Sequence, residues 1–381
     1  MTDDKRITVT YVITAPSHDI EKVSEEIALE QTVEVPRSVV REERIFDEIV
    51  GKVISIEKTG SGDISRYLVR IAYPEIVTGF QVPQFMNLLY GNISFKPGIK
   101  ITGINFSKDF VRAFRGPKFG IEGIRKDAGV FGRPLIATAL KPIGTSADQI
   151  GAFCYRFSLS GIDIIKDDHG LVDFPFCGFR ERVSRCMEAV AKAEGKTGKR
   201  ALYFPNVTDS FERIMKNIEF GLEAGVGGFL VSPFLVGPDT VRYIAGCDWI
   251  DKPLMSHPSF SGNLFTHGDQ GISPEVILGK FFRLIGVDCS VYPNFGGRFH
   301  FDRETCSAIA HSLTDDQYHL KRSFPTPAGG MHLDTIAETA RFYGEDVILL
   351  VGGSLYSRSD DLGENVRYFY DEITEQKRLQ K

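Results

Sequence analysis

From residue 131 to the C-terminus the chain repeats one pattern: a short β-rich run, a turn and a helical segment. The first run is Arg133–Lys141, and the helix after it opens at Thr145 or Ser146, which are both good N-caps. Eight β–α units fit within residues 131–381. This predicts an α/β protein with a (β/α)8 barrel, whose strands are apolar because helices cover them. A doubly wound sheet is the alternative, but Pro142–Gly144 at the first turn lacks its glycine-rich phosphate loop.

Residues 1–115 follow a different pattern, which predicts a small α+β domain of the ferredoxin-like type. We expect strands at Ile7–Thr14, Val53–Glu57, Tyr67–Ala72 and Lys100–Phe106, and helices at Ile20–Leu29 and Val82–Leu89. The segment Gly116–Gly120 is the expected link. The predicted domains are therefore residues 1–115 and 116–381.

Composition limits the class of protein. Hydrophobic residues make up 42% and charged residues 25%, the balance of a folded globular protein. Lys and Arg number 45 against 50 Asp and Glu, without a block of like charge, so we expect neither a nucleic acid nor a membrane as a partner. The N-terminus carries no apolar signal core, and the six cysteines include no Cys-x-x-Cys pair. We therefore expect a cytoplasmic protein with reduced thiols.

Polar residues stand at the C-terminal ends of the predicted strands, where the active sites of (β/α)8 barrels lie. One such residue would mean little, but here lysines, carboxylates, imidazoles, an arginine and two glycine pairs share one mouth. In chain order they are Lys141, Lys166, Asp167, Asp168, His169, Asn206, His257, Arg298, Gly329, Gly330, Gly352 and Gly353.

The second predicted strand, Ile162–Asp168, carries the densest group. With the two-residue period of a strand, Lys166 and Asp168 face the same way, and His169 follows directly. One interpretation is an ion pair at the rim of the barrel. The other is a divalent-metal site formed by Lys166, Asp168 and His169, for which Lys166 would lose its proton or become a carbamate by reacting with carbon dioxide.

The remaining strand-end residues also allow two interpretations. The glycine pairs occupy the usual phosphate position of a barrel, although tight turns explain each pair equally well. Arg298 is either a clamp for a second anion or a surface arginine. His257 either relays a proton or holds a substrate hydroxyl, whereas a lone histidine before a proline is more often structural.

A family resemblance rests on three segments and one histidine, namely Gly116–Gly123, Gly132–Leu135, Gly161–Asp168 and His257. They resemble the RuBisCO large-chain superfamily, and especially its form IV, RuBisCO-like proteins, and the resemblance covers almost the whole chain. It implies a homodimer whose active sites lie between one barrel and the partner's N-terminal domain.

The resemblance implies a metal site on the second strand. Lys166 matches the family lysine that is carbamylated and binds magnesium, and Asp168 matches the second ligand. His169 stands where the carboxylases have a glutamate. Because Mg²⁺ prefers oxygen ligands, another divalent metal remains open.

The resemblance also assigns residues around the substrate. Lys141 matches the catalytic lysine at the end of the first strand, and His257 matches the histidine of the fifth. Arg298 falls near the lysine of the sixth loop. Asn92 matches the asparagine that reaches the substrate across the dimer, and Glu30 is a looser match to an N-terminal glutamate.

One phosphate site of the family is kept and the other is not. Gly330, Gly352 and Gly353 match the first. Pro258 takes the place of the arginine of the second, and Ala328 replaces a serine. The resemblance therefore implies a substrate with one phosphate, and fixation of carbon dioxide is not expected.

The family reactions share an enediolate that a metal stabilises. The run Lys166–Leu171 resembles the sugar-acid branch, whose members decarboxylate 3-oxo-isoapionate 4-phosphate or act on it as transcarboxylase/hydrolases. We expect the magnesium-dependent decarboxylase, a lyase. The alternative is the methionine-salvage enolase, which acts on 2,3-diketo-5-methylthiopentyl-1-phosphate. A metal-free binding protein is a further alternative, which His169 and Pro258 would favour.

Overall fold

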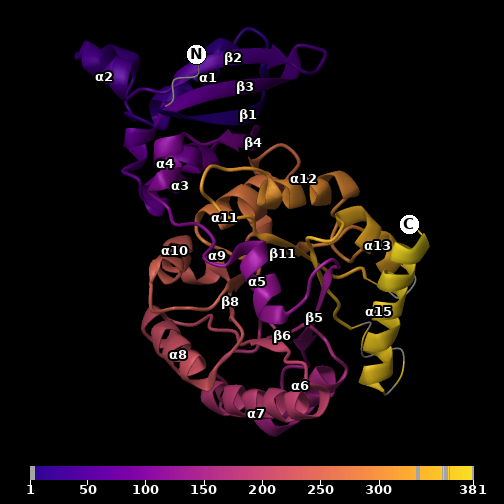
Figure 1. The fold of residues 1–381 in the computed structure, drawn as a ribbon. Coiled ribbons are helices and arrows are strands. Elements are labelled where there is room, and N and C mark those ends of the chain that lie inside the picture. Colours follow the sequence, from indigo (N-terminus) through magenta and orange to yellow (C-terminus); the bar gives the residue numbers. More distant parts are fainter. Residues whose placement is uncertain (1–4, 332–334, 354, 356–358, 360, 380–381) are drawn as a thin grey trace.

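The computed structural model describes residues 5–331, 335–353, 355, 359 and 361–379, and it has an antiparallel N-terminal sheet followed by a parallel barrel (Figure 1). This confirms the predicted fold class. In the described part of the chain, no helix is long and apolar enough to cross a membrane. All six cysteines are free, and five of them are buried.

The N-terminal sheet has the strand order β4-β1-β3-β2, with antiparallel neighbours. Its strands are β1 (Arg6–Pro16), β2 (Lys52–Lys58), β3 (Ile64–Pro74) and β4 (Ile99–Asn105), and its main helices are α1 (Ile20–Glu30) and α3 (Val82–Tyr90). Burial alternates along β1, where Ile7, Val9, Tyr11 and Ile13 face the core. All six elements confirm those expected from the sequence to within a few residues.

Shorter helical segments of the N-terminal part did not emerge from the sequence. They are η1 (Arg37–Val39), α2 (Glu43–Glu48), η2 (Glu75–Thr78), η3 (Asn92–Phe95) and α4 (Lys108–Arg112). Neither η1 nor α2 has a buried residue, so neither shows the apolar periodicity by which a helix is recognised.

The barrel has eight parallel strands in the order β7-β6-β5-β13-β12-β11-β9-β8. They are β5 (Leu135–Leu140), β6 (Ile164–Asp167), β7 (Leu202–Phe204), β8 (Phe229–Val231), β9 (Leu254–Ser256), β11 (Cys289–Pro293), β12 (Phe324–Ala328) and β13 (Ile348–Leu350). Between β7 and β8 the ring is closed by a single bridge, in which the amide of Val207 donates to the carbonyl of Leu230 at 2.9 Å. The eight expected β-runs thus form one nearly closed barrel.

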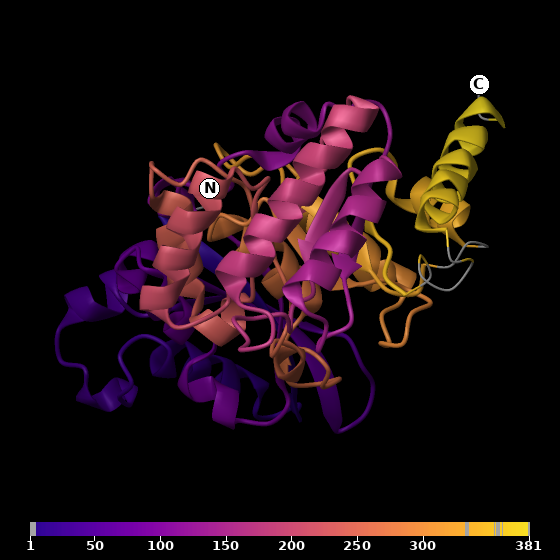
Figure 2. The same cartoon turned by 90° about the horizontal axis from the view of Figure 1, so that it is seen from below.

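Helices surround the barrel strands (Figures 1 and 2). They are α5 (Gly120–Ala128), α6 (Ala147–Leu159), α7 (Phe179–Thr197), α8 (Phe211–Ala224), α9 (Pro233–Val236), α10 (Pro238–Gly246), α11 (Phe282–Leu284), α12 (Arg303–Thr314), α13 (Ile336–Tyr343) and α15 (Leu362–Leu379), with the 3-10 helix η4 (Gly262–Leu264) and the π-helix η5 (Glu275–Phe281). The N-cap predicted at Ser146 is confirmed, because its hydroxyl accepts a hydrogen bond from the amide of Gln149 in a capping box.

Side chains that alternate toward the barrel axis form its interior. They include Leu135, Ile164, Phe204 and Met255, all of them fully buried. Helix α5 joins this cluster and lies across the axis in Figure 1. The Asp288 carboxylate fixes the start of α5, since it accepts hydrogen bonds from the amides of Phe119 and Gly120 at 2.8 and 2.7 Å. The candidate site lies at the opposite mouth of the barrel, where the C-terminal ends of the strands meet.

A short strand from the barrel half extends the N-terminal sheet. β10 (Gly271–Ile272) pairs with β4 in parallel, with Gly271 opposite Lys100 and Ile272 opposite Ile101. One buried hydrophobic cluster runs through both halves, and Phe85 of α3 lies 6.3 Å from Phe281 of η5 between ring centres. The boundary at residues 115 and 116 remains a proposal, because the packing is continuous across it.

A candidate active site at the mouth of the barrel

Two strand ends bring a lysine and a carboxylate together. Lys141 follows β5, and Asp168 follows β6, the neighbouring strand. The Lys141 Nζ atom lies 3.3 Å from Oδ1 of Asp168. The lysine side chain is 45% exposed whereas that of Asp168 is 12% exposed, so the ammonium group faces the open mouth.

Lys166 lies behind this pair, inside the barrel. Its side chain is buried, and its Nζ atom donates a 2.9 Å hydrogen bond to the carbonyl of Asp167. Burial lowers the pKa of Lys166 to about 8, helped by the Lys141 cation and opposed by the Asp168 carboxylate. Near neutral pH a fraction of this amine is therefore unprotonated, the form that can react with carbon dioxide.

Asp168 is the negative centre of the cluster. Burial acts to raise its pKa, but the neighbouring His169 and the charges of Lys166 and Lys141 outweigh burial. The resulting pKa lies well below the usual range of an aspartate. The carboxylate is consequently ionised throughout the physiological range.

The two histidines stack on each other. The rings of His169 and His257 are 4.0 Å apart between centroids, with 5° between their planes. The amide of Ser259 donates to Nδ1 of His257 at 3.3 Å, and the Ser259 hydroxyl lies 2.7 Å from the same atom. With Nδ1 accepting, the proton of the neutral ring belongs on Nε2. Burial, Lys166 and His169 all lower the pKa of His257 well below its usual value, which keeps the ring neutral.

Asp167, which lies between Lys166 and Asp168 in the chain, points away from the mouth. Its carboxylate accepts from Arg182 Nε at 3.0 Å, from the Tyr203 hydroxyl at 2.7 Å and from the amide of Asn206 at 3.0 Å. The Asn206 side chain donates to the carbonyl of His169 at 2.8 Å. Asn206, predicted at a strand end, therefore holds the backbone of the site.

Sequence reasoning missed two of these supporting residues, Arg182 and Ser259. Arg182 lies on α7 and meets Asp167 only through folding. Ser259 had a local signal, since a serine two residues after a polar residue often bonds back to it.

The predicted phosphate residues differ in their surroundings. At Gly330, which has φ +65°, a Cβ atom would lie 2.5 Å from the amide nitrogen of Gly297, so glycine is needed for close packing of two loops. Among the described residues, no atom lies within 4 Å of a Cβ added to Gly352 or Gly353. Arg298 is exposed, and its guanidinium lies over the ring of Phe299 at 4.9 Å.

Asn92 lies on η3 of the N-terminal part. Its side chain donates a 2.9 Å hydrogen bond to Glu30, the looser match from the sequence. Lys141, Asp168, His169 and His257 are linked by the contacts described above, and Lys166 interacts with Asp168 and Lys141 through its charge. Within the described ranges, no hydrogen bond or ion pair joins this cluster to the other predicted residues, which are Asn92, Arg298, Gly330, Gly352 and Gly353.

The donor atoms allow a test of the implied metal. Among the described residues, no three His, Cys, Asp or Glu side chains are gathered as a metal site. Asp168 Oδ1 and His169 Nδ1 are 3.6 Å apart, a separation that one ion can span with bonds of about 2.1 Å. A third donor would come from Lys166 as a carbamate. The set fits a divalent ion that accepts one nitrogen ligand.

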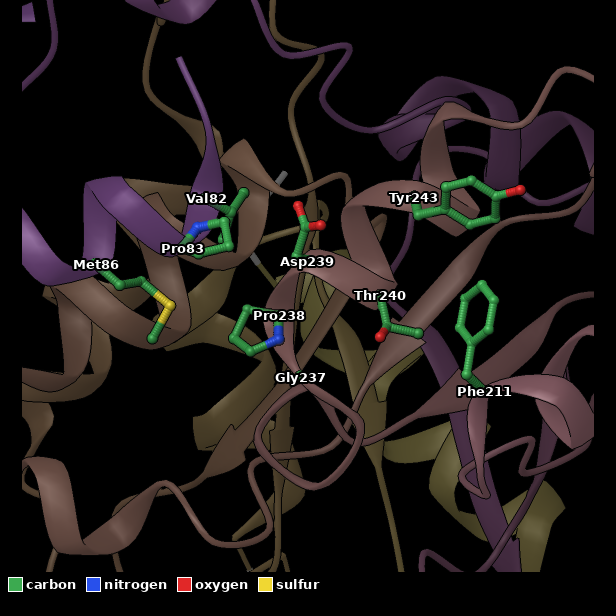
Figure 3. Close-up of a pocket in the computed structure, with 9 residues that line it drawn as sticks. All are labelled: Val82, Pro83, Met86, Phe211, Gly237, Pro238, Asp239, Thr240 and Tyr243. Carbon is green, nitrogen blue, oxygen red and sulfur yellow. The ribbon is translucent and has the colours of Figure 1, made fainter. Parts of the chain in front are cut away.

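A pocket of about 360 Å³ lies between α3 and the first turns of the outer helices α8 and α10 (Figure 3). Its one charged side chain, Asp239, is paired with Arg242 at 2.6 Å. Its lining is otherwise mostly apolar, with Val82, Pro83, Met86, Phe211, Gly237, Pro238, Thr240 and Tyr243. It lacks the titratable cluster of the mouth, which is the stronger candidate for chemistry.

Comparison with known proteins decides the family. The family described as "Ribulose bisphosphate carboxylase large chain, catalytic domain" matches residues 120–361. The chain belongs to the RuBisCO large-chain family. Its similarity to RuBisCO-like proteins places it among the form IV members, and this confirms the resemblance seen in the motifs.

Three relatives show the breadth of this similarity. The chain is 36% identical to ribulose bisphosphate carboxylase-like protein 1 of Rhodopseudomonas palustris, over 97% of this chain and 98% of that one. It is 35% identical to the 5-methylthioribulose-1-phosphate isomerase of Rhodospirillum rubrum, over 97% and 96%. It is 32% identical to the 2,3-diketo-5-methylthiopentyl-1-phosphate enolase of Geobacillus thermodenitrificans, over 90% and 86%.

A solved structure shows the same architecture. The RuBisCO-like protein of Rhodopseudomonas palustris superposes with a TM-score of 0.87 at 33% identity, covering 97% of this chain and 98% of that one. The similarity therefore includes the N-terminal sheet as well as the barrel.

Proposed function

We propose that this RuBisCO-like enzyme forms an enediolate on a monophosphorylated sugar acid and decarboxylates 3-oxo-isoapionate 4-phosphate. The observation that carries the proposal is the Lys141 ammonium, which lies 3.3 Å from Asp168 at the open mouth and in front of the buried Lys166. The Lys141 ammonium lies where a negative charge would develop on a substrate at the mouth. The run Lys166–Leu171 favours the sugar-acid substrate over others of the family.

We assign to Lys141 the proton transfer that the decarboxylation requires. When a β-keto acid loses carbon dioxide, the bond to the carboxyl carbon breaks and its electron pair passes to the adjacent carbonyl. The resulting enediolate needs one proton at carbon, which Lys141 Nζ supplies and then regains from solvent. His257 donates a hydrogen bond from Nε2–H to a substrate oxygen, in keeping with its neutral ring.

A divalent ion in this site would polarise the substrate carbonyl and offset the developing negative charge. Asp168, His169 and a carbamate on Lys166 would hold it. The carbamate forms when the unprotonated amine of Lys166 attacks carbon dioxide, making an N–C bond and releasing one proton. Magnesium is the family ion, and His169 is the ligand that fits it least well.

The phosphate would bind at the backbone of Gly352 and Gly353, with Gly330 fixing the neighbouring turn. Arg298, exposed on the loop after β11, would contact a further acidic group of the substrate. We also propose a cytoplasmic homodimer, in which Asn92 reaches the active site of the partner.

A second candidate reaction is isomerisation of 5-methylthioribulose 1-phosphate. The relative with that printed activity is 35% identical over 97% of this chain. The enolase of 2,3-diketo-5-methylthiopentyl-1-phosphate is the remaining alternative, supported by the relative of Geobacillus thermodenitrificans. Both reactions begin with removal of a proton next to a carbonyl, a task that the same Lys141 could perform as a base.

The test is to incubate the protein with each of the three substrates in D2O, with Mg²⁺ or Mn²⁺ and bicarbonate, and to follow the products by NMR. We expect release of carbon dioxide from 3-oxo-isoapionate 4-phosphate and one deuterium at the carbon that carried it. Turnover of only a methylthio substrate would assign the isomerase or enolase instead. No turnover, together with no thermal stabilisation by any metal or substrate, would favour the non-catalytic alternative.

A further inference from the structure

We propose that His169 is a metal ligand through Nδ1 and that it shifts the site from Mg²⁺ toward a later first-row ion that accepts nitrogen, such as Co²⁺. The inference concerns metal binding in the absence of substrate. It therefore stands or falls separately from the reaction proposed above.

The distance between the two side chains supports one shared ion. Two ligand atoms that each lie about 2.1 Å from a metal are roughly 3.0 Å apart at a right angle and at most about 4.2 Å apart. The 3.6 Å between Asp168 Oδ1 and His169 Nδ1 falls inside this range. Neither side chain has to leave its position to share an ion.

The stacked rings decide which histidine can bind it. An imidazole binds a metal through a lone pair in its ring plane. The rings of His169 and His257 are parallel to within 5° and 4.0 Å apart, so one ion cannot lie in both planes at bonding distance. Nδ1 of His257 is already engaged by Ser259. The Nδ1 atom of His169, by contrast, lies 3.6 Å from Oδ1 of Asp168.

The surroundings hold His169 ready for this role. The ring of His257 covers one of its faces, and Asn206 donates to its carbonyl oxygen at 2.8 Å. Contacts of this kind restrict the direction in which the imidazole points. Mg²⁺ favours an all-oxygen shell, whereas imidazole suits the later first-row ions. The expected preference follows from this donor set.

The experiment measures the dissociation constants of Mg²⁺ and Co²⁺ for the full chain by calorimetry, with and without bicarbonate. Pulsed EPR of the Mn²⁺-loaded protein detects a directly bound ¹⁴N.

The variants are His169→Glu and His169→Gln, with His257→Gln and the exposed His267→Gln as controls, each checked for native circular dichroism. We expect His169→Glu to lower the ratio of Mg²⁺ to Co²⁺ dissociation constants at least about tenfold. The ¹⁴N signal should vanish in both His169 variants and persist in both controls.

Three results would overturn the inference. The first is an affinity ratio that is unchanged in His169→Glu. The second is a ¹⁴N signal that survives in the His169 variants or disappears in His257→Gln. The third is that neither ion binds the wild-type protein, with or without bicarbonate.

Discussion

At the scale of single residues, the burial of Lys166 has a measurable consequence for stability. Its pKa falls from the usual 10.5 to about 8 in the folded protein, chiefly because of burial. Between these two values the unfolded chain binds more protons than the folded one, so the stability contributed by this residue rises with pH. Below about pH 8 both states are protonated, and the folded protein carries the full penalty of a buried charge.

The prediction compares wild type with Lys166→Met in buffers free of carbon dioxide. We expect the variant to be the more stable protein at pH 7, and its advantage to shrink by about 3 kcal/mol between pH 7 and 10.5. Urea unfolding at several pH values measures this difference, in which the titration of other groups cancels. An advantage that does not change with pH would mean that the lysine is not desolvated in the folded state.

Residue by residue, the sequence predicts the reactive groups better than their supports. Lys141, Lys166 and Asp168 could be found because strand ends converge in a barrel. The tight contact of Gly330 with Gly297 could not, since it depends on how two distant loops pack. The stacking of His169 on His257 likewise brings together residues that follow two different strands, and no local sequence pattern predicts it.

At the scale of elements, the buried ion pair between β6 and α7 positions the site. Arg182 and Asp167 have fully buried side chains and meet at 3.0 Å. Replacing Arg182 by Met leaves the Asp167 carboxylate buried without its cation, and we expect a loss of about 3–5 kcal/mol in the free energy of unfolding. Arg185→Met, one turn further along the same helix but exposed, is the control and should leave the urea midpoint unchanged. Equal effects of the two variants would contradict this role for the pair.

Elements with a clear periodicity of apolar residues could be predicted from the sequence, whereas short elements could not. The amphipathic helix α8 buries Ile214 and Ile218, whereas Phe211 at its start is 48% exposed and lines the outer pocket. The two-residue strand β10 pairs across the two halves of the molecule, so its partner in β4 cannot be read from neighbouring residues. The π-helix η5 departs from the period of 3.6 residues by which an α-helix is predicted from its sequence.

At the scale of the whole molecule, we propose that Asn92 acts in the active site of a partner subunit, as the family resemblance implies. Asn92 is exposed and bonded to Glu30 in the N-terminal half, while the lysines lie in the barrel. Each active site of such a homodimer would combine Lys141 of one subunit with the partner's Asn92. Lys141→Met and Asn92→Ala would then remove residues that different subunits contribute to one site. Mixed dimers of the two inactive variants then contain one intact site.

The measurement is the activity of co-expressed Lys141→Met and Asn92→Ala chains. Random pairing gives intact sites in about a quarter of the total, so we expect about a quarter of wild-type activity. Co-expressed Lys141→Met and Lys166→Met chains are the control, because two defects of the barrel cannot complement each other. A mixture no more active than its components would place Asn92 outside the partner's site.

The central claim is that Lys141 moves the proton at the enediolate carbon, and the most direct measurement is the rate of carbon dioxide release from 3-oxo-isoapionate 4-phosphate by wild type and Lys141→Met. We expect the rate to fall about 10²- to 10⁴-fold because proton transfer by Lys141 is lost, and the fold to be unchanged because the side chain is half exposed. A variant that releases carbon dioxide within about tenfold of the wild-type rate would contradict it.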